Sequence, residues 1–98
     1  MIAYTVICSI ENEDKAMEWL KWLTEDHIDD VKRGGAISAS VVKMDDDNIT
    51  YEIRYYFADR KSFDSYLKNY APSLREEGLK LFPEKEGFTY SRTIGEIL

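Results

Sequence analysis

The chain has 98 residues and a mass of 11.5 kDa, which is the size of one domain covering residues 1–98. With 44% hydrophobic and 33% charged residues, the composition excludes a disordered chain and requires a packed core. The net charge of -6 argues against a nucleic-acid partner, because phosphate backbones are bound by clustered Lys and Arg. The single cysteine cannot close an internal disulfide, and residues 1–10 lack the basic flank of a signal peptide and the length of a membrane span. We therefore expect a cytoplasmic protein without a membrane partner.

The first third of the chain predicts a strand followed by a helix. Residues 2–10 are β-branched and aromatic and contain no breaker, which is typical of a strand. Asn12 or Asp14 is expected to cap a helix that ends at Gly34 and Gly35, since glycine readily adopts the backbone conformation of a helix C-terminus. The apolar stripe of this helix consists of Ala16, Trp19, Leu20, Leu23, His27 and Val31.

A hairpin of two strands follows this helix. Residues 36–44 and 49–58 are predicted strands, joined by an acidic tip at residues 45–48. In the second strand, alternation predicts one face formed by Ile49, Tyr51, Ile53, Tyr55 and Phe57. The other face carries Thr50, Glu52, Arg54 and Tyr56.

A second helix and a last strand complete the pattern. Asp59 is expected to cap a helix that runs to Leu81, with a kink or restart at Pro72, which lacks a backbone N–H. The apolar stripe of this helix consists of Phe63, Tyr66, Leu67, Tyr70 and Leu74. Residues 86–97 alternate again and predict a strand, with one face formed by Phe88, Tyr90, Arg92 and Ile94.

The resulting order, βαββαβ, defines the fold class as α+β. Right-handed crossovers arrange this order as one antiparallel four-stranded sheet with two helices on a single face, which is the ferredoxin-like fold. The opposite face then has no cover, although it includes Ala3, Ile7 and Tyr56. We expect a second copy to cover this face in a two-fold dimer, and a solvated monomer is the alternative.

His27 is the only histidine, and it falls near the middle of the first helix's apolar stripe. A buried imidazole needs partners for both ring nitrogens, and tyrosine hydroxyls on the sheet are natural partners. Two interpretations stay open. His27 is either a core histidine bonded to a tyrosine or a carbonyl, or a general base or ligand hydrogen-bonder in a pocket between helices and sheet.

Arg54 and Arg92 lie on predicted strands, where an unpaired cation is costly. Acidic residues, including Glu52 and Glu96, are close to them in the sequence. We expect each of these arginines to form an ion pair rather than to anchor an anion.

Three other features have structural interpretations. Trp22 lies off the stripe and predicts a second contact surface, either a dimer contact or a lip over a pocket. Cys8 lies within a strand and is expected to be a buried, inert thiol. Asp26 and Asp30 near His27 are expected to form a solvated helix end, so no metal site is predicted.

Two segments resemble a known family. Trp19-Leu-Lys-Trp22 followed by His27-Ile28, together with residues 70–79 and Phe82, resembles an uncharacterised bacterial domain-of-unknown-function family. The resemblance implies membership of the dimeric α/β-barrel superfamily, in which two ferredoxin-like units pair sheet against sheet. That superfamily includes cofactor-independent monooxygenases, isomerases and non-catalytic stress proteins.

The resemblance and the residues together predict a homodimer that binds a small apolar or cyclic molecule around His27, without a cofactor and without nucleic acid. A monooxygenase-like or isomerase-like activity would use His27 and Tyr51 as catalytic residues. The expected ligand contacts are Tyr4, Trp19, Tyr55, Tyr70 and Arg75, the last as an anchor for a carboxylate. The alternative is a non-catalytic structural or stress-related dimer with a filled aromatic core, and haem binding is a minor third option.

Overall fold

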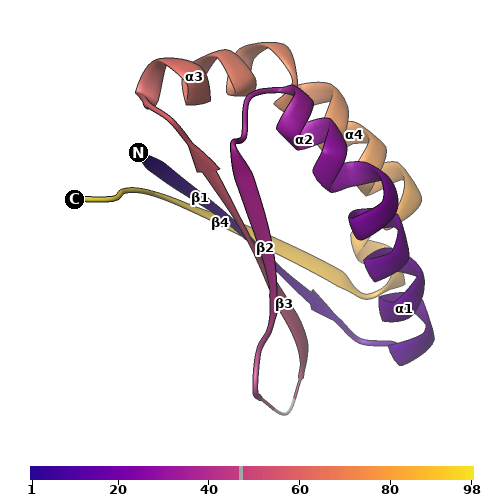
Figure 1. Ribbon diagram of the computed structural model, residues 1–98. Helices are drawn as coiled ribbons and strands as arrows, with labels where there is room; N and C mark the ends of the chain where they lie inside the picture. Colours follow the sequence, from indigo (N-terminus) through magenta and orange to yellow (C-terminus); the bar gives the residue numbers. More distant parts are fainter. Residues whose placement is uncertain (47) are drawn as a thin grey trace.

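The computed structural model describes residues 1–46 and 48–98 and confirms the predicted βαββαβ order (Figure 1). The elements are β1 (Ile2–Ile10), α1 (Glu13–Trp22), the π-helical turn η1 (Leu23–His27), α2 (Ile28–Arg33), β2 (Ser38–Lys43), β3 (Ile49–Phe57), α3 (Arg60–Asn69), α4 (Ala71–Leu81), the 3₁₀ turn η2 (Glu84–Glu86) and β4 (Phe88–Glu96). The predicted hairpin tip at 45–48 includes Asp47, which lies outside the described residues.

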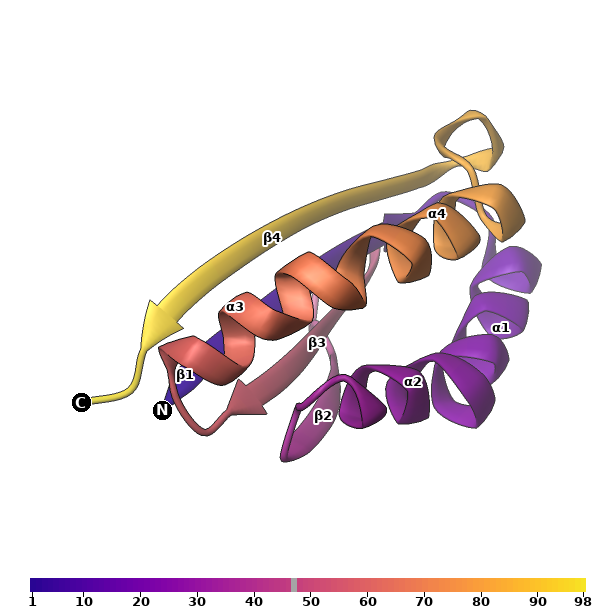
Figure 2. The same ribbon diagram turned by 90° about the horizontal axis from the view of Figure 1, so that it is seen from above.

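The four strands form one antiparallel sheet in the order β2-β3-β1-β4. In this register Tyr4 of β1 lies beside Tyr55 of β3 and Ile94 of β4. Figures 1 and 2 show two helical arms, α1–η1–α2 and α3–α4, on the same side of the sheet. The predicted ferredoxin-like arrangement is therefore confirmed, and the face of β3 that carries Ile53 and Tyr55 is the one that the helices bury.

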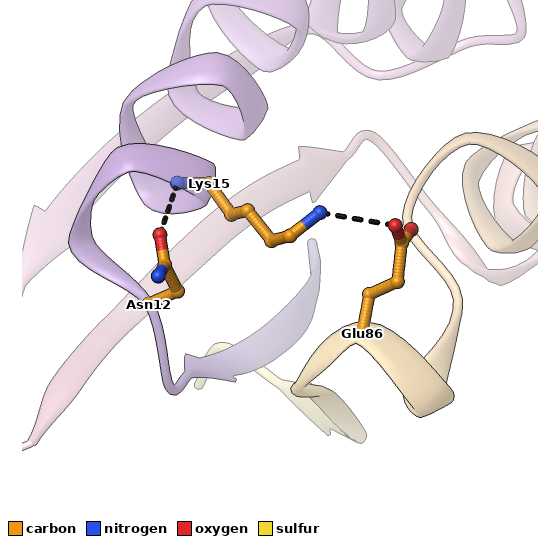
Figure 3. Close-up of polar contacts among 3 residues, drawn as sticks. All are labelled: Asn12, Lys15 and Glu86. Atoms are coloured by element: carbon orange, nitrogen blue, oxygen red, sulfur yellow. Dashed lines mark hydrogen bonds and ion pairs between the residues drawn. The ribbon is translucent and has the colours of Figure 1, made fainter.

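The start of α1 is fixed at one corner of the sheet by local polar contacts. Asn12 is the N-cap, and its side-chain oxygen accepts a hydrogen bond from the Lys15 N–H at 3.0 Å. Such a cap contributes about 1 kcal/mol to helix stability. The Lys15 ammonium also pairs with Glu86 of η2 at 3.0 Å, which joins the beginning of α1 to the turn before β4 (Figure 3).

The first helical arm is not the single regular helix that the sequence predicts. Its middle is the π-helical turn η1, in which the Ile28 N–H bonds to the carbonyl of Leu23, five residues earlier. One extra residue per turn changes which side chains share a face beyond this point. The arm ends as predicted, at Gly35, whose positive φ of 127° suits glycine.

The second helical arm is broken where the sequence predicts a restart. Asp59 caps α3 by accepting a hydrogen bond from the Ser62 N–H at 2.8 Å. Tyr70, with φ −122° and ψ −44°, separates α3 from α4, and Pro72 occupies the first turn of α4. Proline is tolerated there because the first N–H groups of a helix have no intrahelical acceptor.

The core lies between the sheet and the helices and is dominated by aromatic side chains. The rings of Tyr4, Phe57, Phe63 and Tyr66 pack against one another with centroids 5.1–6.4 Å apart. No helix among the described residues is long and apolar enough to cross a membrane. The sheet face away from the helices is mixed in character, with Ala3, Ile7, Val42 and Tyr56 among serines and threonines.

Candidate functional site

A cavity of about 50 Å³ lies between the sheet and the helices, next to η1 and α4. This is room for about four water-sized groups. The apolar walls include Trp19, Trp22, Leu23, Ile53, Leu74 and Leu79. No Asp or Glu among the described residues lines the cavity, and its polar groups come from Tyr4, His27, Tyr55, Tyr66, Arg75, Tyr90 and Arg92.

The π-helical turn positions His27 in this cavity. Trp22 and His27 are five residues apart, which in an α-helix would place them about 140° apart around the axis. Across η1, which lies between Trp22 at the end of α1 and Ile28, their rings instead stack, with centroids 4.5 Å apart and planes at 26°. Trp22 also packs on Phe82 at 5.4 Å, so it closes one side of the cavity as the predicted lip over a pocket.

His27 is a neutral group with unused hydrogen-bonding capacity. Burial lowers the pKa of His27 to about 4; Asp30 opposes this shift, and the positive charge of Arg92 adds to it. Its Nδ1 atom is buried and has no hydrogen-bond partner among the described residues. A buried polar nitrogen without a partner is unusual and costs free energy unless a ligand or water satisfies it.

Two arginines converge on one tyrosine at the other side of the cavity. Arg75 of α4 donates from Nη2 to the Tyr4 hydroxyl oxygen at 3.1 Å, and Arg92 of β4 donates from Nε to the same oxygen at 3.1 Å. Arg75 Nε is buried and has no partner among the described residues. This end of the cavity therefore combines positive charge with donors that no carboxylate of residues 1–46 and 48–98 neutralises.

Four of the expected ligand contacts, Tyr4, Trp19, Tyr55 and Arg75, line the cavity together with His27. The other two aromatic candidates do not. Tyr51 faces the helices but packs on Trp19 at 5.5 Å, four residues and roughly 13 Å along β3 from Tyr55. Tyr70 is 41% exposed at the break between α3 and α4, where its ring lies against Gly34.

The expectation of an ion pair is confirmed for Arg54 and wrong for Arg92. Arg54, on the open face, pairs with Glu52 at 3.3 Å. Arg92 has no carboxylate partner among the described residues and contacts Tyr4 instead. Strand alternation places Arg92 on the same face as Phe88 and Tyr90. Because this face lies beneath the helices, that position was the sequence signal that Arg92 belongs to the site.

Cys8 lies on the same sheet face as the cavity but does not line it. Its side chain is fully buried, and burial raises the pKa of the thiol to about 12, although the Tyr90 hydroxyl acts to lower it. Such a thiol stays protonated, as the predicted inert cysteine would. Within the described part of the chain, no three His, Cys, Asp or Glu residues gather as metal ligands would.

Small domains with this fold serve many different functions. The fold and a cavity with histidine and arginine therefore do not by themselves identify one activity. The chain belongs to the family "Domain of unknown function (DUF4286)", whose model matches residues 1–96. No curated protein sequence matches the chain at a significant level.

Solved structures share the fold at low sequence identity. A dimeric ferredoxin-like protein from an uncultured marine organism has a TM-score of 0.72 and 14% identity, covering 100% of this chain and 95% of its own. SnoaB, a cofactor-independent oxygenase from Streptomyces nogalater, has a TM-score of 0.73 and 11% identity, covering 99% and 92%. A putative antibiotic biosynthesis monooxygenase from Nitrosomonas europaea has a TM-score of 0.69 and 13% identity, covering 100% and 99%. At such identities these likenesses establish the fold and nothing finer.

Proposed function

We propose that this chain is a cytoplasmic homodimer that binds a small apolar or cyclic molecule in the cavity, with His27 as its hydrogen-bond and proton acceptor. The observation that carries the proposal is His27 Nδ1, which is buried in the cavity wall and has no hydrogen-bond partner in the described part of the chain. A neutral imidazole can accept a hydrogen bond, and the lowered pKa keeps His27 neutral at physiological pH while making it a weaker base than an ordinary histidine.

Gly78 supports the proposal because it keeps the cavity open at a cost in stability. This glycine lies in the interior of α4, where it is less favourable than alanine by about 1 kcal/mol. A Cβ atom added there would lie 3.4 Å from the Trp22 ring, an ordinary contact distance. Alanine would therefore fit, and its methyl group would occupy part of the space beside Trp22 that the glycine leaves open.

The cavity also limits what can bind. At about 50 Å³ it accepts the head of a ligand rather than a whole drug-sized molecule. Leu79, 46% exposed, lies among its lining residues, so the body of a larger ligand can extend past it toward solvent. An oxygenase-like or isomerase-like reaction would need His27 to take a proton from the part of the ligand that lies beside its imidazole.

The dimeric state is supported by the uncovered sheet face. Neither view of the molecule shows a helix on that side (Figures 1 and 2), and the marine ferredoxin-like protein of the same fold is dimeric. Ile7 lies on the central strand of this face.

Ligand binding is tested by a thermal-shift screen of small cyclic and aromatic metabolites on the full chain. A ligand of the proposed site raises the melting temperature of the wild type and of Asp26→Ala, an exposed control in the same π-helical turn. The stabilisation is lost in His27→Ala. It is also reduced in Gly78→Ala, although this variant itself melts higher than the wild type. Stabilisation that is unchanged in both cavity variants would contradict the proposed site.

The dimer is tested by sedimentation or light scattering. The wild type is expected at twice the chain mass of 11.5 kDa. Ile7→Lys on the open face should produce monomers, whereas Met17→Lys, at a helix position 68% exposed, should not. A wild type of 11.5 kDa at micromolar concentration would refute the dimer and leave the cavity proposal standing.

A further inference from the structure

We infer that the cavity selects ligands that carry a carboxylate, seated at the end where Arg75 and Arg92 meet the Tyr4 hydroxyl. This inference rests on the proposed function and names the chemical class of its ligand. It is carried by three observations on the described residues: shared hydrogen bonding, missing counter-charges and an unused donor.

Because the hydrogen bonding is shared, the guanidinium cations of Arg75 and Arg92 both contact the uncharged hydroxyl oxygen of Tyr4. Both guanidinium groups donate to the Tyr4 oxygen at 3.1 Å, so they lie within a few ångströms of each other. Like charges this close repel, and a phenol oxygen does not neutralise either of them. An anion placed between them would remove the repulsion and accept hydrogen bonds from both.

The counter-charges are missing although the chain has a surplus of acids. The ion pairs within the described residues join Lys15 to Glu86, Arg33 to Asp30 and Arg54 to Glu52. Neither Arg75 nor Arg92 takes part, in a chain with 19 acidic and 13 basic residues. A strongly acidic protein that leaves its two cavity arginines without a carboxylate has the charge arrangement of an anion site.

The unused donor is Arg75 Nε, which is buried and has no acceptor. A guanidinium presents its N–H groups as a planar fork that matches the two oxygens of a carboxylate. The Tyr4 hydroxyl group is a further donor at this point, since its oxygen accepts both of these hydrogen bonds and its hydrogen is used in neither. The site therefore offers donors from three side chains to one planar anion.

The remaining walls of the cavity determine the polarity and the size of the rest of the ligand. Trp19, Trp22 and Leu74 are apolar walls that lower the local dielectric and strengthen the attraction between the arginines and an anion. Arg92 is exposed, so an anion can reach the site from solvent. The volume of about 50 Å³ fits a carboxylate with its adjoining carbon, and a ring can extend toward the mouth beside Leu79.

The experiment compares charged and uncharged probes of the same shape on the full chain. Benzoate and benzamide, acetate and acetamide, and inorganic phosphate are titrated while the indole N–H signals of Trp19 and Trp22 are followed by NMR. We expect benzoate to bind at least about tenfold more tightly than benzamide, because each hydrogen bond to a charged group contributes strongly. Acetate should likewise bind more tightly than acetamide.

Matched variants assign this preference to the two arginines. Arg75→Gln and Arg92→Gln should each remove most of the preference for benzoate over benzamide. Arg60→Gln removes the same charge from an exposed position at the start of α3 and should leave the preference unchanged. Thermal melts of all three variants verify that they are folded.

The outcomes separate this inference from the proposed function. If benzoate and benzamide bind equally and lose affinity equally in Gly78→Ala, the cavity binds ligands but the carboxylate assignment is wrong. Tighter binding of phosphate than of either carboxylate also overturns that assignment. If no probe shifts the indole signals of the wild type, the proposed cavity function fails and the inference fails with it.

Discussion

The layer between sheet and helices differs sharply between its two ends. Beneath α3, Phe57 and Phe63 are fully buried and pack with ring centroids 5.1 Å apart. Beneath η1 and α4, the same layer contains a cavity, a histidine nitrogen and two arginines, and within the part of the chain that the structure describes the nitrogen has no hydrogen-bond partner and the arginines have no carboxylate partner. One end is built for stability, and the other carries His27 Nδ1 and Arg75 Nε, two buried polar atoms whose burial costs free energy unless something binds them.

Tyr4 stands at the boundary between these two ends. Its ring packs on Phe63 at 5.3 Å, while its hydroxyl accepts hydrogen bonds from Arg75 and Arg92. The aromatic residues that the sequence presents as one set therefore serve two purposes. The predictions below test whether stability and binding are divided in this way.

The largest expected effect is at the filled end. Phe63→Ala should lower the free energy of unfolding by about 3–5 kcal/mol, because it leaves a cavity among close-packed rings. Leu79→Ala, at the rim of the existing cavity and 46% exposed, should lower it by less than about 1 kcal/mol. Urea unfolding measures both values, and equal losses would contradict the division.

A smaller effect is expected in the pH dependence of stability. The pKa of His27 is about 4 in the folded chain against an ordinary value of 6.5, so the unfolded chain binds more protons between these values. The free energy of unfolding should therefore rise with pH across this window, by no more than about 3 kcal/mol from His27 alone.

The contribution of His27 is isolated by His27→Gln. Urea unfolding at both ends of the window is compared between this variant and the wild type, with Asp30 and Arg92, the charges acting on the imidazole, left in place. The part of the pH dependence that the variant lacks is assigned to His27. Identical curves for the two proteins would show that the imidazole is not held neutral by burial.

The smallest expected effect has the opposite sign. His27→Phe keeps a ring on Trp22 and removes the unpartnered nitrogen, so at neutral pH it should stabilise the chain by about 1 kcal/mol. Thermal melts in a dialysed buffer would show a higher melting temperature. A loss of stability would indicate that Nδ1 has a partner, and the cavity end would then be as satisfied as the filled end.

Much of the fold could be predicted because its signals are local. A short polar side chain before a helical pattern of apolar residues indicates an N-cap, and Asn12 and Asp59 do cap their helices. Pro72 marks the break between α3 and α4. Strand alternation correctly separates the buried from the open face of β3. Each of these signals depends on residues within a few positions of one another.

Part of the site escaped prediction because its geometry is not local. A regular helical wheel places Trp22 and His27 on different faces of the helix. Their rings stack because of the π-helical turn, which no pattern in the sequence predicts. Tyr51 and Tyr55 share a face of β3, but only the position of the cavity along that strand distinguishes them.

By itself, the sequence determined the order of the elements, the two faces of the sheet and a short set of chemically capable residues, with His27 and Arg75 among them. Only the tertiary structure decided which of these residues meet. Arg75 and Arg92 reach Tyr4 across separations of 71 and 88 residues. Periodicity and capping act over one or two turns of chain, whereas contacts at such separations arise when the sheet and the helices pack together.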